Sequence, residues 1–484
     1  MLNAGAGTPH SPLRRFLITA AWGLILLAAA FVFVKREISL AGNETSRLAV
    51  IQSLVDNGTF DITNSLFRTP DKAFLNGKYY GDKPPLLTWL SAGEYFLLSR
   101  VFGLTFENAY HTVIFLLYLP YFLVSAATGF LFFILLTDIL PRAPLAWRTA
   151  ASALSVLSTL VFSYSVTIGN HGVCAFLLML LLLRMRRAEE HDMRLRDAFY
   201  CGLVTGLIFN CEFVLGGVCG LAIFFFCITW PGTMKLRVQR GLCYAVGASL
   251  LIACEGLMNA AAYGSPLPLY LLTHKPDIAH KNYLYYAWNV LFGFEGFFLY
   301  MPACLFIFPV LCRPFPGRGR SAWYILSCCL GATLLFLAGT SDYGGFCYGY
   351  RFLVPVAPVL LLYVFLSFYV KRRKGLCGAV LALALLWGVT TSLAGTLNPW
   401  NSGYEGSLTH AGNMNEQIRN GFLVNATVFV FDLAPESALS KFLIERVYGV
   451  MPACYMICEE YLNRREDAKA RAAYAWFAER YAQP

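Results

Sequence analysis

The segment TVIFLLYLPYFLVSAATGFLFFILLT, residues 112–137, decides the fold because it contains no charged side chain. A helix crosses the ~30 Å hydrocarbon core of a bilayer with about 20 mainly apolar residues. An apolar run inside a water-soluble core is usually much shorter, at about 10 to 14 residues. The sequence therefore predicts a transmembrane helix over these residues.

Ten further apolar segments predict a protein that crosses the membrane many times. Residues 199–229 count as two spans that meet at Glu212, because one helix of that length would exceed the thickness of the hydrocarbon core. The predicted fold class is an all-α polytopic membrane protein, a bundle of about eleven transmembrane helices. The ten other spans are 16–34, 149–166, 172–186, 199–211, 213–229, 241–261, 289–311, 322–339, 352–370 and 376–396.

The composition excludes most soluble proteins. Charged residues make up 14% of the chain and hydrophobic residues 57%, with a mean hydropathy of +0.56. Soluble domains carry about 25% charged residues, and disordered chains are far less apolar than this one. Most of the 15 cysteines lie in the apolar segments, where a thiol behaves as a small hydrophobe. We therefore predict neither a disulfide framework nor a zinc site.

The positive charge is concentrated in alternate loops. Half of the 38 Lys and Arg residues lie in six short segments that face one side, whereas the short loops of the other side hold only three. This is the positive-inside pattern, and it explains the net charge of +10 without a nucleic-acid partner. It predicts an integral membrane protein with a cytoplasmic N-terminus, and we expect the membrane to be a bacterial inner membrane. The six basic segments are 1–15, 138–148, 184–198, 230–240, 312–321 and 371–375.

Two regions are predicted outside the bilayer on the opposite face. The first loop, residues 35–111, contains an amphipathic run at Leu48–Val55 and a second run from Pro84 to Phe102, and we expect both to be helices on the membrane surface. The first span follows two arginines and lacks a clear cleavage site, so it reads as an uncleaved anchor. The other region is the C-terminal tail.

The tail, residues 397–484, mixes acidic and basic side chains. A run of β-branched and aromatic residues predicts a strand from Ala426 to Phe431, and a polar helix is expected from Glu459 to Tyr481. The chain thus divides into a membrane domain, 1–396, and this tail, in which no catalytic pattern is evident.

Short motifs occur in a fixed order on the predicted non-cytoplasmic side. Together they resemble the GT-C glycosyltransferases, in the branch that contains protein O-mannosyltransferases and aminoarabinose transferases. The resemblance covers roughly residues 16–396. The motifs are Asn43-Glu44 with Ser53-Leu54, Gly58 and Phe60; Lys83-Pro84-Pro85; Asn170-His171; Tyr263-Gly264-Ser265-Pro266; and Gly344-Gly345 through Gly349-Tyr350-Arg351-Phe352 to Pro355 and Pro358.

This resemblance implies transfer of a sugar from a polyprenyl-phosphate-linked donor to a hydroxyl group of a lipid, glycan or protein acceptor. Such a reaction needs a base for the incoming hydroxyl and cations for the departing phosphate. The resemblance makes Glu44 the candidate base and assigns the phosphate to Lys83 and Arg351. The other candidate substrate-binding residues are Asn43, Asn170, His171, Glu212 and Tyr350.

Many members of this family carry Asp directly before the Glu, whereas this chain has Asn43. This chain therefore has one carboxylate where the family pattern leads us to expect two. Because the second possible oxygen ligand is missing, we assign no metal ligand. No cofactor is specified, and a divalent cation remains an option. Glu255 and Glu295 also lie near the non-cytoplasmic ends of spans, where ionisable residues are costly and often functional.

A purely structural role, without any part in catalysis or binding, remains an alternative for these residues. Glu44 could be a helix cap, Lys83 could be a snorkelling residue at the membrane interface, and Arg351 could anchor its helix. At the level of the whole chain, the alternatives are a secondary transporter and an inactive lipid-binding membrane protein. The sequence shows no paired inverted repeats of the kind found in many secondary transporters, which argues against the transporter alternative.

The charge pattern makes a topological prediction. Cysteine-accessibility labelling should place positions near Arg186 and Arg372 on the cytoplasmic side, and positions near Asp71 and Glu405 on the opposite side. Labelling of Asp71 and Arg372 from the same side would show that the number of spans between them is wrong.

Overall fold

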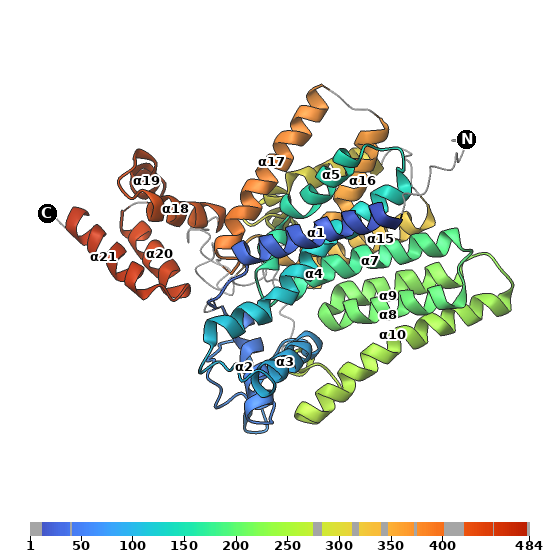
Figure 1. Ribbon diagram of the computed structural model, residues 1–484, viewed down its shortest axis with the longest axis horizontal. Coiled ribbons are helices and arrows are strands. Elements are labelled where there is room, and N and C mark those ends of the chain that lie inside the picture. Colours follow the sequence, from blue (N-terminus) through green and yellow to red (C-terminus); the bar gives the residue numbers. More distant parts are fainter. Residues whose placement is uncertain are drawn as a thin grey trace.

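Helices make up nearly all of the regular structure. The computed structural model describes residues 12–38, 41–273, 283–311, 319–339, 347–371, 375–400, 421–448 and 450–481. Within these ranges the only sheet is one two-stranded hairpin. The helices up to α17 form a large bundle, and α18–α21 stand beside one end of it (Figure 1).

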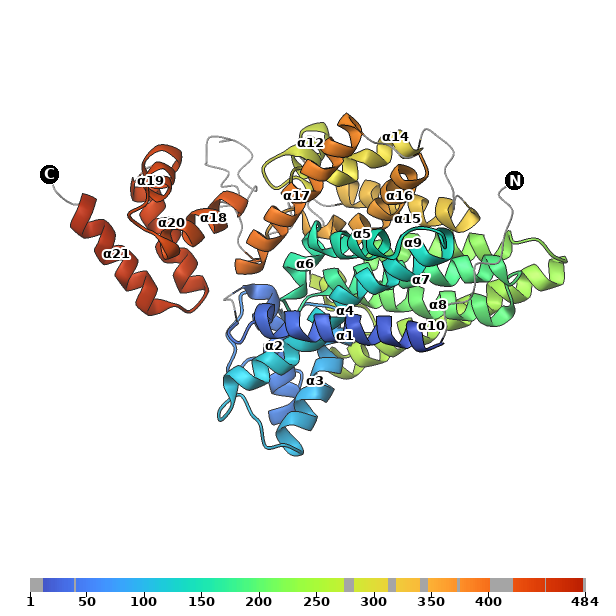
Figure 2. The same ribbon diagram turned by 45° about the horizontal axis from the view of Figure 1, so that its top comes forward.

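Six long helices run alongside one another through the bundle, with α8 packed against α7, α9 and α10 (Figures 1 and 2). Short connections join α7 to α8, α8 to α9 and α9 to α10, so these four helices alternate in direction. The bounds of the six helices are α1 (Pro12–Phe33), α4 (Tyr110–Ile139), α7 (Asn170–Glu190), α8 (Leu195–Cys211), α9 (Phe213–Ile228) and α10 (Met234–Tyr263).

A second group of helices completes the bundle and packs against α4 and α7. It carries most of the remaining apolar sequence. It includes α5 (Leu145–Leu157), α6 (Leu160–Ser165), α15 (Arg320–Gly339), the 3₁₀ segment η2 (Arg351–Val356), α16 (Ala357–Val370) and α17 (Leu376–Leu397). Its short members are α11 (Leu269–Thr273), α12 (Tyr283–Phe292), α13 (Phe297–Tyr300), the 3₁₀ segment η1 (Pro302–Phe306) and α14 (Ile307–Leu311).

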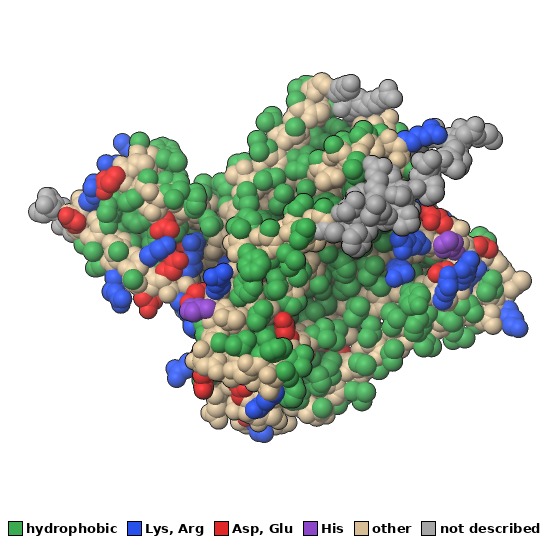
Figure 3. Space-filling view, viewed as in Figure 1, with side chains coloured by type: hydrophobic (Ala, Val, Ile, Leu, Met, Phe, Trp, Pro, Cys, Tyr) green, Lys and Arg blue, Asp and Glu red, His purple; other side chains and the backbone are tan. Residues whose placement is uncertain are grey.

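The surface of the bundle has the distribution expected for a membrane protein. Hydrophobic side chains cover its middle, and charged side chains gather at its ends and over the tail (Figure 3). Five described helices are long and apolar enough to cross a membrane: α4, α10, α15, η2 with α16, and α17. The segments 283–300 and 302–311 make a sixth if their bent pair counts as one span. The mostly helical, membrane-spanning fold is therefore confirmed, whereas the number eleven stays a prediction.

Two predicted spans are not continuous helices. The span 149–166 is interrupted at Ser158-Thr159, where Thr159 adopts an extended conformation and its hydroxyl turns back to the carbonyl oxygen of Ser155. The span 289–311 bends by 101° at its break. Side-chain hydroxyl groups that donate to backbone carbonyls compete with the backbone hydrogen bonds of a helix. A prediction based only on the length of an apolar segment does not detect this competition.

The first loop folds into two helices joined through a hairpin. These are α2 (Gly42–Asp56), β1 (Lys72–Leu75), β2 (Lys78–Gly81) and α3 (Pro85–Arg100). Asn76 and Gly77 both have positive φ, as the tight turn of a two-residue hairpin requires. Both helices were predicted, but α2 is not amphipathic: ten of its residues are buried, polar and apolar alike.

The tail consists of α18 (Gly421–Leu433), α19 (Ala438–Phe442), the π-helical segment η3 (Leu443–Tyr448), α20 (Val450–Asn463) and α21 (Asp467–Tyr481). Its own apolar cluster includes Val428, Phe431, Ile457 and Phe477. The strand predicted at Ala426–Phe431 is wrong, because these residues lie in α18. Burial of one helical face against neighbours outweighs β propensity there. The polar helix predicted at Glu459–Tyr481 is two helices, with a break between Asn463 and Asp467.

Some sequence predictions fall outside the described residues. They concern Gly344-Gly345, the basic residue Arg372, the labelling position Glu405 and the N-terminal residues before Pro12.

Close helix contact at α8 and α10 depends on glycine. A Cβ at Gly202 would collide with the backbone carbonyl of Tyr244, and one at Gly247 would collide with that of Phe199. Small residues at such crossings let two membrane helices approach until their backbones touch.

We therefore predict that Gly202→Leu forces α8 and α10 apart and costs about 1–3 kcal/mol of stability. Thermal unfolding of the purified protein in detergent measures this loss. The control is Gly217→Leu on α9, where an added Cβ meets nothing within 4 Å. Equal melting temperatures for the two variants would refute the close contact.

Candidate functional site

The first turn of α2 is held where the first loop folds back on itself. The hydroxyl of Thr69 donates to the carbonyl oxygen of Gly42 at 3.0 Å, and the hydroxyl of Thr45 donates to that of Ala41 at 3.0 Å. A Cβ on Gly42 would come within 2.7 Å of the Asp71 carboxyl carbon. These contacts fix the start of α2, and with it the side chains of Asn43 and Glu44.

Glu44 is fully buried and accepts a hydrogen bond of 2.9 Å from the Tyr118 hydroxyl of α4. Lys35, just beyond the end of α1, lies close enough for the two charges to interact. Burial lowers the pKa of Lys35, and the charges of Glu44 and Glu460 oppose that decrease. Glu44 therefore lies between a phenol and an amine, at the junction of the first loop and the bundle.

Arg47 is a buried cation that the sequence analysis missed. Its guanidinium donates to Asn43 Oδ1 at 3.4 Å, to Thr88 Oγ1 at 3.3 Å and to the carbonyl oxygen of Pro84 at 3.5 Å. Burial lowers its pKa, and the neighbouring charge of Arg351 acts in the same direction. Its position one turn after Asn43, on the same helical face, is the sequence signal that could have identified it.

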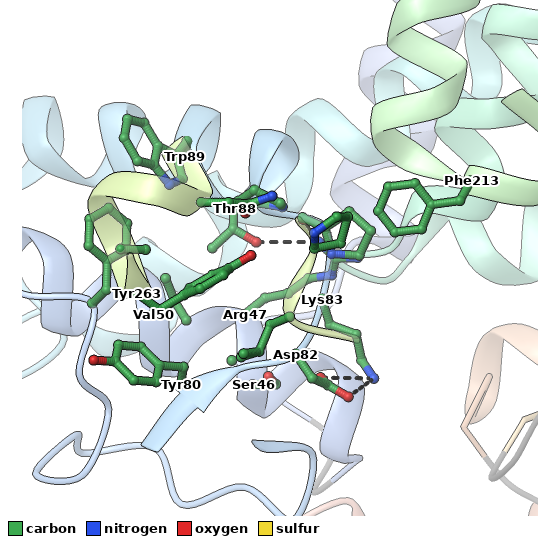
Figure 4. A pocket seen from close by; sticks show the side chains of 18 residues that line it. Ser46, Arg47, Val50, Tyr80, Asp82, Lys83, Thr88, Trp89, Phe213 and Tyr263 are labelled. Atoms are coloured by element: carbon green, nitrogen blue, oxygen red, sulfur yellow. Dashed lines mark hydrogen bonds and ion pairs between the residues drawn. The ribbon is translucent and has the colours of Figure 1, made fainter. Parts of the chain in front are cut away.

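A cleft of about 570 Å³, including its open mouth, lies between the first loop and the end of α10. Arg47 and Lys83 line it together with Asp82, Thr88 and several aromatic side chains. Figure 4 shows Tyr80, Trp89 and Tyr263 gathered at one end of this cleft, and Lys83 at the other. It thus combines cations with flat apolar surfaces.

Lys83 has two acidic partners. Its ammonium group lies 3.0 Å from Asp71 Oδ2 and 3.1 Å from both carboxylate oxygens of Asp82. Its side chain is 19% exposed. The predicted phosphate-binding lysine is therefore at the cleft, but its charge is already balanced by these carboxylates.

Arg351 begins η2 and stacks on two aromatic rings, at 5.2 Å from the centre of Phe352 and 5.6 Å from that of Trp400. Its charge acts on Arg47 and also on Glu212, in the connection between α8 and α9. The predicted residue Arg351 and the missed residue Arg47 thus come from distant parts of the sequence and lie close together.

The predicted pair Asn170-His171 lies beside Arg351, at the start of α7. Asn170 Nδ2 donates to Glu212 Oε2 at 3.0 Å and to the carbonyl oxygen of Cys211 at 2.7 Å. The His171 ring packs against Tyr164 and Phe352. Among the described residues, neither ring nitrogen of His171 has a hydrogen-bond partner.

Tyr350 is fully buried, and its hydroxyl lies 3.3 Å from that of Tyr286 on α12. Glu44 is not among the residues that line the cleft. The candidate residues therefore divide into a carboxylate site around Glu44, a cleft around Arg47 and Lys83, and a polar cluster around Arg351, with Arg47 joining all three.

No group of three or more His, Cys, Asp or Glu side chains suited to a metal ion occurs in the described ranges. At Asn43-Glu44 the amide oxygen already accepts a bond from Arg47. Divalent cations such as Ca²⁺ take several oxygen ligands, and a single carboxylate next to Lys35 does not fit that need. No step proposed below involves a metal.

Comparison with known proteins identifies the fold. The chain resembles ArnT from Cupriavidus metallidurans bound to undecaprenyl phosphate, with a TM-score of 0.50 and 15% identity over 94% of this chain and 77% of that one. The apo form gives a TM-score of 0.50 and 14% identity, over 95% and 78% of the two chains. ArnT is an aminoarabinose transferase of the GT-C type, so the predicted GT-C fold is confirmed. No protein-family model and no curated protein sequence matches the chain.

Glu212 makes the stability depend on pH. Burial raises its pKa to about 7, and the charge of Arg351 offsets this only in part. The folded state then binds a proton that the unfolded state, with a pKa near 4.5, has released. Stability must therefore fall as pH rises from about 4.5 to 7.

We predict that Glu212→Gln, which can still accept the bond from Asn170, removes up to about 3 kcal/mol of this pH-dependent loss. Thermal unfolding of both proteins across this pH range tests the prediction, with exposed Glu190→Gln as the control. Parallel curves for wild type and Glu212→Gln would contradict it.

Proposed function

We propose that the protein is a glycosyltransferase that moves a pentosyl or hexosyl unit from a polyprenyl-phosphate carrier to a hydroxyl acceptor. The acceptor class is a lipid, a glycan or a protein. The observation that carries the proposal is the pair Arg47, which lines the cleft, and Arg351, whose charge acts on Arg47, within a GT-C fold. Arg47 is buried, Arg351 is partly buried, and the charges of both act on Glu212. Like charges that interact in this way favour a bound anion.

The donor's phosphate is the anion that we assign to this pair. Guanidinium groups bind phosphate oxygens through paired hydrogen bonds, and they stabilise the charge that develops on the departing phosphate. Undecaprenyl phosphate is bound in the ArnT neighbour, which supports a donor of this class here. The aromatic side chains of the cleft offer apolar faces to the sugar or to the first part of the lipid.

Lys83 is proposed as a third cation of the phosphate site. Asp71 and Asp82 lie 3.0 and 3.1 Å from its ammonium group. In the free protein these carboxylates balance the charge of Lys83 and hold its ammonium group at the cleft. Asn43, Asn170, His171, Glu212 and Tyr350 are proposed to surround the donor or to hold the residues that contact it.

Glu44 is proposed as the base that takes the proton of the acceptor hydroxyl. It is a buried carboxylate close to Arg47 in α2, and the Tyr118 hydroxyl fixes its orientation. The attacking oxygen bonds to the sugar carbon, the bond from that carbon to the phosphate oxygen breaks, and the polyprenyl phosphate leaves with that electron pair. Lys35 lies close enough for its charge to interact with that of Glu44.

The site is proposed to face the non-cytoplasmic side of a bacterial inner membrane. The positive-inside pattern supports a cytoplasmic N-terminus, and the first loop and the tail would then lie together outside. Residues 1–396 would form the catalytic membrane domain, and 397–484 would form an extracytoplasmic tail.

We predict that Glu44→Gln binds the donor and fails to transfer sugar, with a rate lower by about 10²–10⁴-fold. The measurement is transfer from radiolabelled polyprenyl-phosphate sugars, with undecaprenyl phosphate binding measured in parallel. Asn43→Asp is the control, because a carboxylate there still accepts the bond from Arg47. Wild-type transfer by Glu44→Gln would remove Glu44 from the reaction.

We also predict that Arg351→Ala weakens undecaprenyl phosphate binding by about tenfold or more, since a charged hydrogen bond contributes about 1.5–3 kcal/mol. Arg47→Lys should weaken it as well, because an ammonium group lacks the planar fork. Lys83→Ala should have a smaller effect than Arg351→Ala. Unchanged affinity in both arginine variants would remove the phosphate from this site.

A further inference from the structure

Glu295 is a buried carboxylate that joins three distant segments. It lies between α12 and α13 and is 7% exposed. Its Oε2 accepts a bond of 2.6 Å from the backbone N–H of Gly349 and one of 3.2 Å from the Tyr300 hydroxyl. Its Oε1 accepts a bond of 2.8 Å from the backbone N–H of Gly421. Gly349 is two residues before Arg351, and Gly421 is the first residue of the tail helix α18.

Both backbone donors are glycines for steric reasons. Gly349 has φ +67°, and a Cβ there would come within 2.6 Å of Leu160. At Gly421 a Cβ would lie 3.2 Å from Glu295 Oε1. At Gly349 this arrangement requires glycine, whereas at Gly421 an added Cβ would be tight against the carboxylate.

The N-terminus of α18 faces this carboxylate with two N–H groups. Gly421 donates to Glu295, and Phe422 donates to the Tyr300 hydroxyl at 3.2 Å. The first N–H groups of a helix have no partner within the helix and carry a partial positive charge. Glu295 therefore serves as the cap of a helix that belongs to the tail.

A second set of bonds ties the tail to the other side of Arg351. Asn398 Nδ2 donates to Glu460 Oε1 of α20 at 2.6 Å, and Asn425 Nδ2 of α18 donates to the carbonyl oxygen of Asn398 at 3.2 Å. Asn398 Oδ1 in turn accepts from the backbone N–H of Trp400 at 3.1 Å. Trp400 is one of the two rings on which the Arg351 guanidinium stacks.

We propose that Glu295 is a positioning residue for the donor's phosphate, and that the tail is part of this device. The carboxylate fixes the backbone just before Arg351, while α18 and α20 fix Trp400 beneath the guanidinium. The inference rests on the proposed function, because it takes Arg351 as the phosphate-binding cation. It assigns to the tail a role that the sequence of the tail does not suggest.

The physical basis is the number of donors that a buried carboxylate needs. Two backbone N–H groups and one phenol satisfy Glu295, and they come from the Arg351 segment, the tail and α13. A carboxamide cannot replace it, because both oxygens face N–H donors and the NH₂ group of Gln would oppose one of them. Loss of the charge should release Gly349 and let Arg351 leave its position.

The test uses full-length protein with three measurements: undecaprenyl phosphate affinity, hydrogen exchange in residues 347–356, and a double-mutant cycle between Glu295→Gln and Arg351→Ala. Glu295→Gln should weaken binding by about tenfold or more, because small misplacements of a contact group are costly. Exchange in 347–356 should rise, and the double variant should bind no more weakly than Arg351→Ala. Tyr300→Phe is a milder second variant, expected to move both measurements in the same direction.

Glu436→Gln is the matched control, an exposed tail glutamate whose partners Lys441, Arg480 and Trp476 all lie within the tail. Losses that add fully in the double variant would overturn the inference, as would weaker binding without faster exchange in 347–356. Wild-type affinity for both Glu295→Gln and Tyr300→Phe would also overturn it. Wild-type affinity for Arg351→Ala would instead overturn the proposed phosphate site, while the exchange data still report whether Glu295 holds the segment.

Discussion

The structure depends on the pairing of charges that are buried inside an apolar bundle. A buried charge is tolerated only where opposite charges or hydrogen bonds surround it. Glu44 and Arg47, side by side in α2, meet this condition through Tyr118, Asn43 and Thr88. Because these partners lie on α4, α2 and α3, satisfying the two charges fixes the first loop against the bundle. The cleft forms where that loop meets α10.

The same constraint explains why the tail contacts the bundle where it does. Glu295 of the bundle and Glu460 of the tail helix α20 are both buried, and each accepts hydrogen bonds from a distant segment of the chain. The N–H of Gly421 serves the first, while Asn398 and Arg464 serve the second. Tail and bundle therefore complete one another's hydrogen bonds, close to Arg351. The likeness to ArnT, at 15% identity, shows the shared fold and does not support mannosyl specificity.

The sequence predicted the features that arise from local pattern. Apolar length and the alternation of basic loops predicted the membrane helices, and the limit that the bilayer sets on helix length predicted the break at Glu212. Motif order predicted the GT-C fold, whereas the roles of the candidate site residues stay predictions. The sequence singled out Glu295 only as an ionisable residue near the end of a span, and it missed Lys35 and Arg47, since the roles of all three depend on partners far away in the chain. The strand prediction for residues in α18 was wrong, because β propensity is a local property that does not include the packing of a helix against its neighbours.

The location of the phosphate tests the central claim most directly. A cryo-EM map of the full-length protein saturated with undecaprenyl phosphate would reveal it. We expect the phosphate group within hydrogen-bond distance of the guanidinium groups of Arg47 and Arg351, with the lipid chain leaving through the cleft between α3 and α10. A phosphate bound elsewhere, with Arg47 still bonded to Thr88 and Arg351 still stacked on Trp400, would contradict the account.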